Sequence, residues 1–431
     1  MKFNRVCQLT RPALLPALGA LLLVLPGFRA EAAAAARFAL RTPGAVTSMD
    51  ISSNGRQLLT VSTGRAYIWD LPSGRFIRPI QAAPCALQNA GFSSDGLHIF
   101  SRRRDCDQGS GARELPLYRI FSGVLETRLH RTSGRLTAIA YADFSTNGQN
   151  RPSVLAEGEN GNSSYTAVGG PEEGNPVDLP TESDGLAPLP QRILATAADD
   201  GWLRYYDVDS GGPVFARRLE QFQERTLRQA LIPVAFSPDL SLLAVRNWQD
   251  YYLSIIDVST GAILHRTEYY VANQNEHQVV QFAPDGGEYF DGARLRRSRS
   301  GEMVATIAMR ECCAVEAARF SADGNQLAIL RRFHPVPGKQ SDARVEYEPQ
   351  LQAPADIPEP AALQVQDLSA GAPVQSVIEI HSLQGETASD ADLRHLVLLS
   401  TAVSALAWYP DGSRLFYGDS NGMVRTVRLS Q

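Results

Sequence analysis

Short apolar runs alternate with polar turns along almost the whole chain. Seven times an apolar, mostly aromatic residue is followed three positions later by Asp or Asn, usually with Gly next. The copies are Ile51-Ser-Ser-Asn54-Gly55, Phe92-Ser-Ser-Asp95-Gly96, Phe144-Ser-Thr-Asn147-Gly148, Phe236-Ser-Pro-Asp239-Leu240, Phe282-Ala-Pro-Asp285-Gly286, Phe320-Ser-Ala-Asp323-Gly324 and Trp408-Tyr-Pro-Asp411-Gly412. Asp-Gly and Asn-Gly between β-like segments predict tight hairpins, because such turns need positive φ. A hairpin that recurs in this way predicts a repeat architecture.

Each copy lies within the same set of four β-like runs. A small or apolar residue stands two positions before the aromatic one, which is the period-two alternation of a strand with one buried face. A second apolar run follows the turn, as in residues 57–61 and 241–245. A third run ends at a polar turn with Gly, as in residues 66–70, and a fourth run comes next, as in residues 75–80. Four short antiparallel strands per unit describe a propeller blade, so we predict an all-β, seven-bladed β-propeller.

Two segments carry a resemblance to a known family. Residues 194–207 resemble the second strand, turn and third strand of the WD-repeat β-propellers, and Trp69-Asp70 is the one literal WD dipeptide. The resemblance covers nearly everything after the N-terminal segment. The family's Gly-His dipeptide is missing, so most blades lack its buried Asp-His-Ser/Thr-Trp network. The chain is therefore similar to a divergent, bacterial WD-repeat protein; a TolB-like or lactonase-like propeller is the alternative.

The resemblance also implies how the ring closes. The final copy has three β-like runs and ends with residues 423–429, while a strand-like stretch, residues 36–41, precedes the first copy. In the family, such an N-terminal strand completes the last blade. Without it, the ring would expose an unpaired strand edge, which promotes aggregation.

Two intervals between copies are about twice as long as the others. Residues 150–191 and 333–375 are rich in Pro, Gly, Glu, Asn and Ser, a composition typical of loops. We interpret both as loop insertions. An eighth blade without its marker, around Glu182-Ser-Asp-Gly185, is the alternative.

The N-terminus has the pattern of a secretory signal peptide. Lys2, Arg5 and Arg11 precede a short apolar core, and Ala30-Glu31-Ala32 matches a cleavage site. We therefore expect residues 1–32 to be removed, leaving a single propeller domain of residues 33–431 in the periplasm or outside the cell, with no membrane insertion. Cleavage changes the formal net charge from −5 to −8, because four basic side chains and one acidic one are lost. Such a balance does not favour nucleic acid.

An oxidising compartment permits disulfides between the remaining cysteines. Cys85 and Cys106 are a candidate pair within the second blade, and Cys312 and Cys313 are candidates for a vicinal disulfide. Four unpaired buried thiols are the alternative, because sequence does not fix connectivity.

Motifs that carry chemistry are missing from the sequence. The seven histidines show no metal-ligand spacing, and there is no nucleophile elbow, phosphate-binding glycine loop or HExxH motif. Residues 257–261 resemble part of the docking motif of quinoproteins, but the Trp expected after the Gly is absent. The arginines of residues 294–299 have acids nearby, which predicts salt bridges rather than an anion site. We therefore expect no enzyme activity, no metal and no cofactor; a lactonase-like metal hydrolase or a quinoprotein is the alternative.

The loops between second and third strands are the better clue to function. Long loops on rigid scaffolds are commonly functional or disordered. Residues 333–375 and several aromatic residues fall on this face, where WD-repeat proteins usually bind partners. Exposed aromatic and arginine side chains can anchor a protein partner, although the same rings can instead cap the blade cores. The candidates are Arg103, Trp202, Trp248, Tyr251, Phe333 and His334. We expect an exported scaffold that binds another protein.

Overall fold

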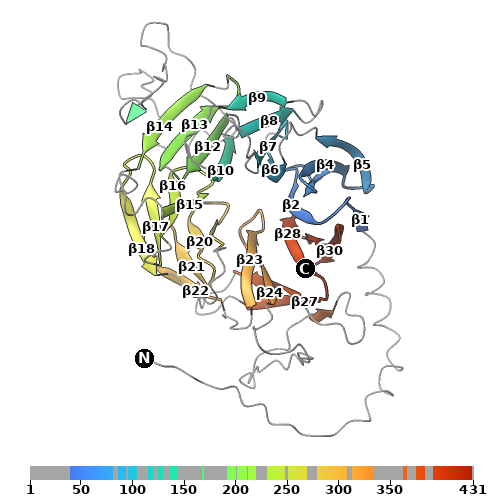
Figure 1. Ribbon diagram of the computed structural model, residues 1–431. Helices are drawn as coiled ribbons and strands as arrows, with labels where there is room; N and C mark the ends of the chain where they lie inside the picture. Colours follow the sequence, from blue (N-terminus) through green and yellow to red (C-terminus); the bar gives the residue numbers. More distant parts are fainter. Residues whose placement is uncertain are drawn as a thin grey trace, which may run out of the picture.

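The computed structural model describes residues 39–80, 86–93, 96–103, 115–119, 125–129, 136–143, 167–168, 192–199, 201–210, 212–219, 231–247, 251–268, 279–307, 313–333, 363–365, 375–383 and 392–429. All of the secondary-structure elements within these ranges are β-strands. The described strands form seven sheets set around a common axis, as in a propeller (Figure 1). The prediction of an all-β propeller is therefore confirmed.

Six of the sheets are each formed by one continuous stretch of the chain, and each antiparallel set of four strands is called a blade. Blade 1 contains β2 (Val46–Ile51), β3 (Gln57–Ser62), β4 (Arg65–Asp70) and β5 (Arg75–Ile80). Blade 2 contains β6 (Leu87–Phe92), β7 (His98–Arg103), β8 (Leu115–Arg119) and β9 (Leu125–Leu129). Blade 3 contains β10 (Leu136–Asp143), β12 (Arg192–Ala198), β13 (Trp202–Asp207) and β14 (Pro213–Arg218).

The second half of the ring repeats the arrangement. Blade 4 contains β15 (Leu231–Phe236), β16 (Leu242–Asn247), β17 (Tyr252–Asp257) and β18 (Ile263–Glu268). Blade 5 has shorter strands, β19 (Gln281–Phe282), β20 (Glu288–Phe290), β21 (Arg294–Arg297) and β22 (Met303–Thr306). Blade 6 contains β23 (Cys313–Phe320), β24 (Gln326–Phe333), β26 (Ser376–Ser382) and β27 (Asp392–Leu399).

Blade 7 joins the two ends of the described chain. β28 (Val403–Trp408), β29 (Arg414–Asp419) and β30 (Met423–Arg428) are followed, at the outer edge, by the N-terminal β1 (Ala39–Arg41). β1 pairs antiparallel with β30, with Leu40 opposite Val424. The prediction that an N-terminal strand completes the last blade is thus confirmed.

The repeated motif forms the turn between the first and second strands of a blade. In blade 6, Ser321 Oγ accepts a hydrogen bond from Gln326 N at 2.9 Å and donates to Asp323 Oδ1 at 2.6 Å. Gly324 N donates to Ser321 O at 3.0 Å, and Gly324 has a φ of 74°. The Ser therefore holds the turn, the Asp orients the Ser, and the Gly supplies the left-handed backbone. The blade 3 copy at Phe144 lies outside the described residues.

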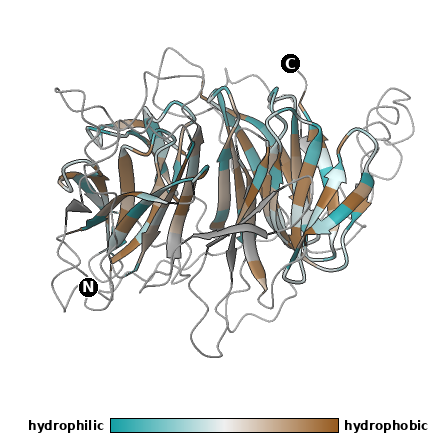
Figure 2. Cartoon of the chain, turned by 90° about the horizontal axis from the view of Figure 1, so that it is seen from above, coloured by the Kyte–Doolittle hydropathy of each residue, from teal (hydrophilic) through white to brown (hydrophobic). Residues whose placement is uncertain are grey.

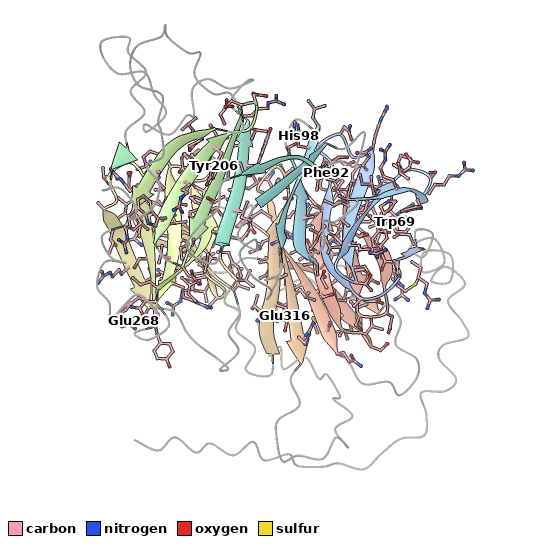
Figure 3. The ribbon with its side chains drawn as sticks, turned by 45° about the horizontal axis from the view of Figure 1, so that its top comes forward. Trp69, Phe92, His98, Tyr206, Glu268 and Glu316 are labelled. Atoms are coloured by element: carbon pink, nitrogen blue, oxygen red, sulfur yellow. The ribbon has the colours of Figure 1, made fainter. Side chains whose placement is uncertain are left out.

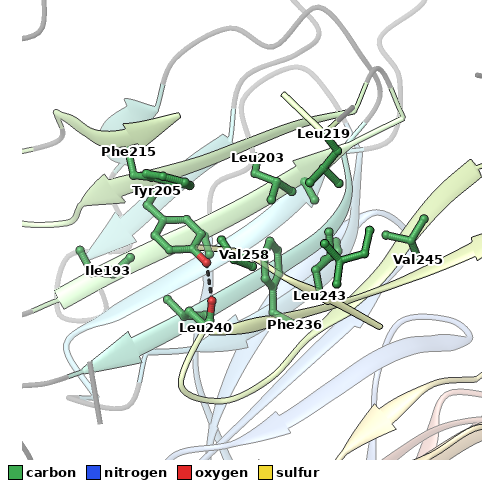
Figure 4. Close-up of a cluster of buried hydrophobic side chains, with 14 of the residues drawn as sticks. Ile193, Leu203, Tyr205, Phe215, Leu219, Phe236, Leu240, Leu243, Val245 and Val258 are labelled. Atoms are coloured by element: carbon green, nitrogen blue, oxygen red, sulfur yellow. Dashed lines mark hydrogen bonds between the residues drawn. The ribbon is translucent and has the colours of Figure 1, made fainter. Parts of the chain in front are cut away.

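Blade 4 has Leu240 where the other described copies have Gly. Leu240 keeps the same turn, with a φ of 61° and a bond from its N to Ser237 O at 2.9 Å. Its side chain is fully buried between blades 3 and 4. Its carbonyl accepts a hydrogen bond from the hydroxyl of Tyr205, a buried residue of β13 (Figure 4). This turn therefore links two blades as well as two strands.

Hydrophobic side chains fill the spaces between blades. Each of the seven junctions around the ring has its own cluster of buried residues, including the junction between blades 7 and 1, where Leu40 and Phe416 pack with Leu58. Apolar residues lie along the strands, and hydrophilic ones gather in the connections at the two rims (Figure 2). Sheet-to-sheet burial therefore holds the ring together.

Two blades carry a short extra strand. β11 (Ala167–Val168) pairs parallel with the outer strand of blade 3, and β25 (Leu363–Val365) pairs parallel with the outer strand of blade 6. They belong to the two long intervals, between β10 and β12 and between β24 and β26. Apart from these strands and the ends of the second interval, Phe333 and Gln375, both segments lie outside the described residues. So does the alternative blade around residues 182–185.

Blade 1, which has the literal WD dipeptide, keeps part of the family's buried network. Trp69 Nε1 donates to Thr60 Oγ1 at 2.9 Å, and both side chains are buried. Thr60→Val keeps the shape but leaves the indole N–H unpaired, so we expect the free energy of unfolding to fall by about 1 to 2 kcal/mol. Thr60→Ser keeps the hydroxyl and should lose less. Chemical denaturation of both variants measures the difference, and equal losses would contradict the hydrogen-bond explanation.

Candidate partner-binding face

Four of the six predicted surface residues are placed by the structure at equivalent ends of the blades. Arg103 ends β7, Trp202 begins β13, Tyr251 directly precedes β17 and Phe333 ends β24. Strands alternate in direction within every blade, so all connections from second to third strands lie on one face of the ring. We call this the candidate face. The side chains of Arg103 and Phe333, and all of Trp248 and His334, lie outside the described residues.

Tyr251 is the most exposed aromatic residue described on this face. Its relative exposure is 54%, and the next residue, Tyr252, is 36% exposed. Tyr251 has a φ of 59° in the hairpin that joins β16 to β17. A left-handed backbone costs a bulky residue about 1 to 2 kcal/mol, and such strain gathers at functional sites. The hairpin therefore presents an exposed tyrosine ring from a backbone conformation that Gly or Asn would adopt more easily.

Trp202 is less available than Tyr251. It is half-buried, and the Cζ atom of Arg204 lies 5.0 Å from its ring centroid. Arg218 stands directly opposite Trp202 on β14. A cation over an indole ring is attracted by the ring's negative face. Trp202 thus packs against its own blade, as the capping alternative expected, while Tyr251 projects outward.

The charges on this face have both signs. Glu268 ends β18 directly opposite Tyr252, and Glu316 pairs with Arg332 at 3.5 Å (Figure 3). Partly exposed ion pairs of this kind contribute little to stability but help to set the charge pattern that a partner meets. A tyrosine pair beside a carboxylate is therefore the main feature of blade 4 here.

Sequence reasoning missed Tyr252 and the two charged residues Asp50 and Arg319 near the axis. Tyr252 was not predicted to be a surface residue, because it begins a strand, where an aromatic residue is expected to be buried. Asp50 and Arg319 stand directly before the marker residues Ile51 and Phe320; the blade 3 copy has Asp143 at this position, and the other four copies have Gly, Ala or Gln. That departure was visible in the sequence and signals a special position.

Other predictions about chemistry have mixed outcomes. Arginines of residues 294–299 do form ion pairs: Arg296 with Asp291 at 2.8 Å, Arg297 with Glu288 at 2.9 Å and Arg299 with Asp257 at 3.7 Å. The expected salt bridges are thus confirmed for these three arginines. Cys85, Cys106 and Cys312, like the side chain of Cys313, lie outside the described residues, so both disulfides remain predictions.

The described residues contain no group of three or more His, Cys, Asp or Glu side chains that could hold a metal ion. Within the same part of the chain, no helix has the length and apolar character needed to cross a membrane.

Comparisons with known proteins support the architecture. Residues 38–70 match the family described as WD domain, G-beta repeat. A chain in the crystal structure of the mitotic checkpoint complex is similar over 92% of this chain and 95% of its own length, with a TM-score of 0.53 and 12% sequence identity. That likeness concerns the fold alone. No curated protein matches the sequence. The chain is thus an all-β propeller whose residues 38–70 match a WD repeat, the stretch that holds β1 to β4.

Proposed function

We propose that this protein is an exported, non-enzymatic scaffold that binds another protein through the candidate face. The observation that carries the proposal is the Tyr251–Tyr252 pair: two adjacent exposed tyrosines, one of them held at positive φ, on a rigid blade. Tyrosine anchors protein interfaces well, because its ring buries a large area at a small entropic cost and its hydroxyl forms hydrogen bonds.

The family resemblance supports the same proposal. WD-repeat propellers commonly bind proteins, and the structurally similar chain belongs to a complex. The signal-peptide pattern of residues 1–32 supports export to the periplasm or beyond, and the negative charge of the remaining chain supports a protein partner over nucleic acid. Fold alone does not fix function, so the test must address the surface itself.

Site-specific cross-linking tests the proposal directly. A photoreactive amino acid replaces Tyr251, and the protein is irradiated in cells that export it. We expect one discrete cross-linked protein partner, because the side chain is exposed on the candidate face. The same probe at Thr260, an exposed residue at the opposite end of blade 4, is the matched control and should give no such product.

A second arm measures the contribution of the tyrosine pair. Tyr251→Ala combined with Tyr252→Ala should reduce recovery of the cross-linked partner's complex at least tenfold, as expected when central anchors are removed. The melting temperature should change little, because both rings are exposed. Equal cross-linking from positions 251 and 260, or full recovery by the double variant, would overturn the assignment of this face.

A further inference from the structure

Two opposite charges lie on the innermost strands of the ring. Asp50 belongs to β2 of blade 1, and Arg319 belongs to β23 of blade 6; Gln281 of β19 lies beside Arg319. We call these three residues the axial site. Innermost strands surround the axis of the ring (Figure 1). Arg319 is exposed to solvent and Asp50 is half-buried, so water reaches both side chains.

Each charge is fixed by neighbours that leave part of it free. Arg319 Nη1 donates to Gln281 Oε1 at 3.2 Å and to Ala318 O at 2.8 Å. Within the described part of the chain, its Nε and Nη2 make no hydrogen bond. Trp408 Nε1 holds the backbone of the same residue, donating to Arg319 O at 2.8 Å.

The carboxylate is held in a similar way across the junction of blades 1 and 2. Asp50 Oδ1 accepts from Ile51 N at 2.9 Å, and Oδ2 accepts from Phe92 N at 2.7 Å. Each oxygen keeps a second lone pair. The neighbouring position on β6 is Gly91, where an added Cβ would lie 3.4 Å from Asp50 Oδ2. Blade 2 therefore places no side chain over the carboxylate at that position.

Asp50 and Arg319 affect each other's pKa although they do not form an ion pair. The surrounding strands displace part of the water around Asp50, and this desolvation raises its pKa to about 6, although the backbone N–H groups of Phe92 and Ile51 and the charge of Arg319 act against the shift. The same partial desolvation lowers the pKa of Arg319, and the charge of Asp50 partly offsets it. Among the described residues, neither side chain forms an ion pair within 4.0 Å. The fold therefore keeps two incompletely neutralised charges near its axis, an arrangement more typical of a binding site than of a structural ion pair.

We propose that the axial site binds a small zwitterion, a molecule with both a carboxylate and an ammonium group, such as a free α-amino acid. The ligand carboxylate accepts from the free Nε and Nη2 edge of Arg319, the two-pronged geometry that guanidinium groups favour. The ligand ammonium donates to the free lone pairs of Asp50. An anion alone would be repelled by the negative charge of Asp50, and a cation alone would be repelled by the positive charge of Arg319. A zwitterion is therefore the class of ligand that suits both residues.

Calorimetry with glycine tests this proposal on the full mature chain. Acetate and methylammonium, each carrying one half of the glycine charge pattern, are the matched control ligands. We expect glycine to bind at least tenfold more tightly than either. Arg319→Gln and Asp50→Asn should each weaken glycine binding at least tenfold. Arg294→Gln and Glu302→Gln change exposed charges on blade 5 and should leave it unchanged.

The dependence on pH gives a readout that needs no variant. Arg319 is the charged group that acts on Asp50 from another strand, so protonation of Asp50 removes the one partner of the ligand ammonium. Glycine affinity should therefore fall as the pH is lowered from 7 to 5. Glycine binding no tighter than that of acetate or methylammonium, affinity independent of pH, or full binding by both axial variants would each overturn the proposal. The cross-linking test above is independent of these outcomes.

Discussion

Deletion of residues 33–41 is expected to lower the free energy of unfolding by several kcal/mol. The deletion removes β1, whose three residues pair with Met423, Val424 and Arg425 of β30. It also removes Leu40, which is 5% exposed in the cluster between blades 7 and 1. Burial of a Leu side chain contributes about 2 kcal/mol, and each hydrogen bond of the ladder contributes about 1 kcal/mol. The unpaired edge of β30 would also promote aggregation.

Chemical denaturation and light scattering would measure these effects on the mature protein. A chain that lacks only residues 33–38 is the matched control, because it keeps β1 intact and should unfold like the full mature chain. If the deletion of residues 33–41 left both the unfolding free energy and the aggregation rate unchanged, closure of the ring by β1 would not be needed for stability.

Leu240→Gly is expected to destabilise the protein by about 2 kcal/mol, although it places the usual residue in the turn. Glycine relieves a left-handed strain of about 1 to 2 kcal/mol. However, the substitution empties a fully buried site between blades 3 and 4, and removal of a buried Leu side chain costs about 3 to 5 kcal/mol. The loss therefore outweighs the relief, and thermal or chemical unfolding would show it.

A substitution in blade 5 separates the two contributions. Gly286 occupies the same turn position in blade 5, with a φ of 73°, and an added Cβ would lie 3.8 Å from Pro238 Cδ without a clash. Gly286→Ala, which adds only this Cβ, should therefore cost about the left-handed strain alone, about 1 to 2 kcal/mol. A stabilised Leu240→Gly variant would show that strain, rather than packing, dominates at this turn.

The repeated turn made most of the fold predictable from sequence. An apolar residue followed three positions later by Asp or Asn, usually with Gly next, predicts one local turn, so each copy marked the end of a first strand and the start of a second. The turn at Leu240 was recognised through Ser237 and Asp239, yet the contact with Tyr205 was not predicted. That contact depends on how two blades pack, and no local pattern encodes it. Neither β11 nor β25 was predicted to join the edge of a blade. Both strands are very short, and their pairing likewise depends on contacts that no local pattern encodes.

The location of the candidate face could be predicted from the sequence, but the exposure of its side chains could be predicted only in part. Strand order places second-to-third connections on one side, so Trp202 and Tyr251 were assigned to it correctly. Their different exposures, half-buried and 54%, depend on Arg204 and on the hairpin conformation. The two unusual charges were visible in the sequence, but their combination into one site was not, because Asp50 and Arg319 are far apart in sequence and their strands are placed around one axis only when the ring forms.

Closure of the ring has a consequence for the order of folding. Thr42 and Gly422, which are bonded through Thr42 N and Gly422 O at 2.8 Å, are 380 residues apart in the chain. During synthesis, β1 therefore emerges first and waits for its partner until nearly all other strands have been made. Contacts between residues so distant in sequence form slowly, because a long loop must close before the pairing is gained. We therefore expect the pairing of β1 with β30 to be the last step of folding, so that a chain that has not yet formed this pair is an open arc rather than a closed ring.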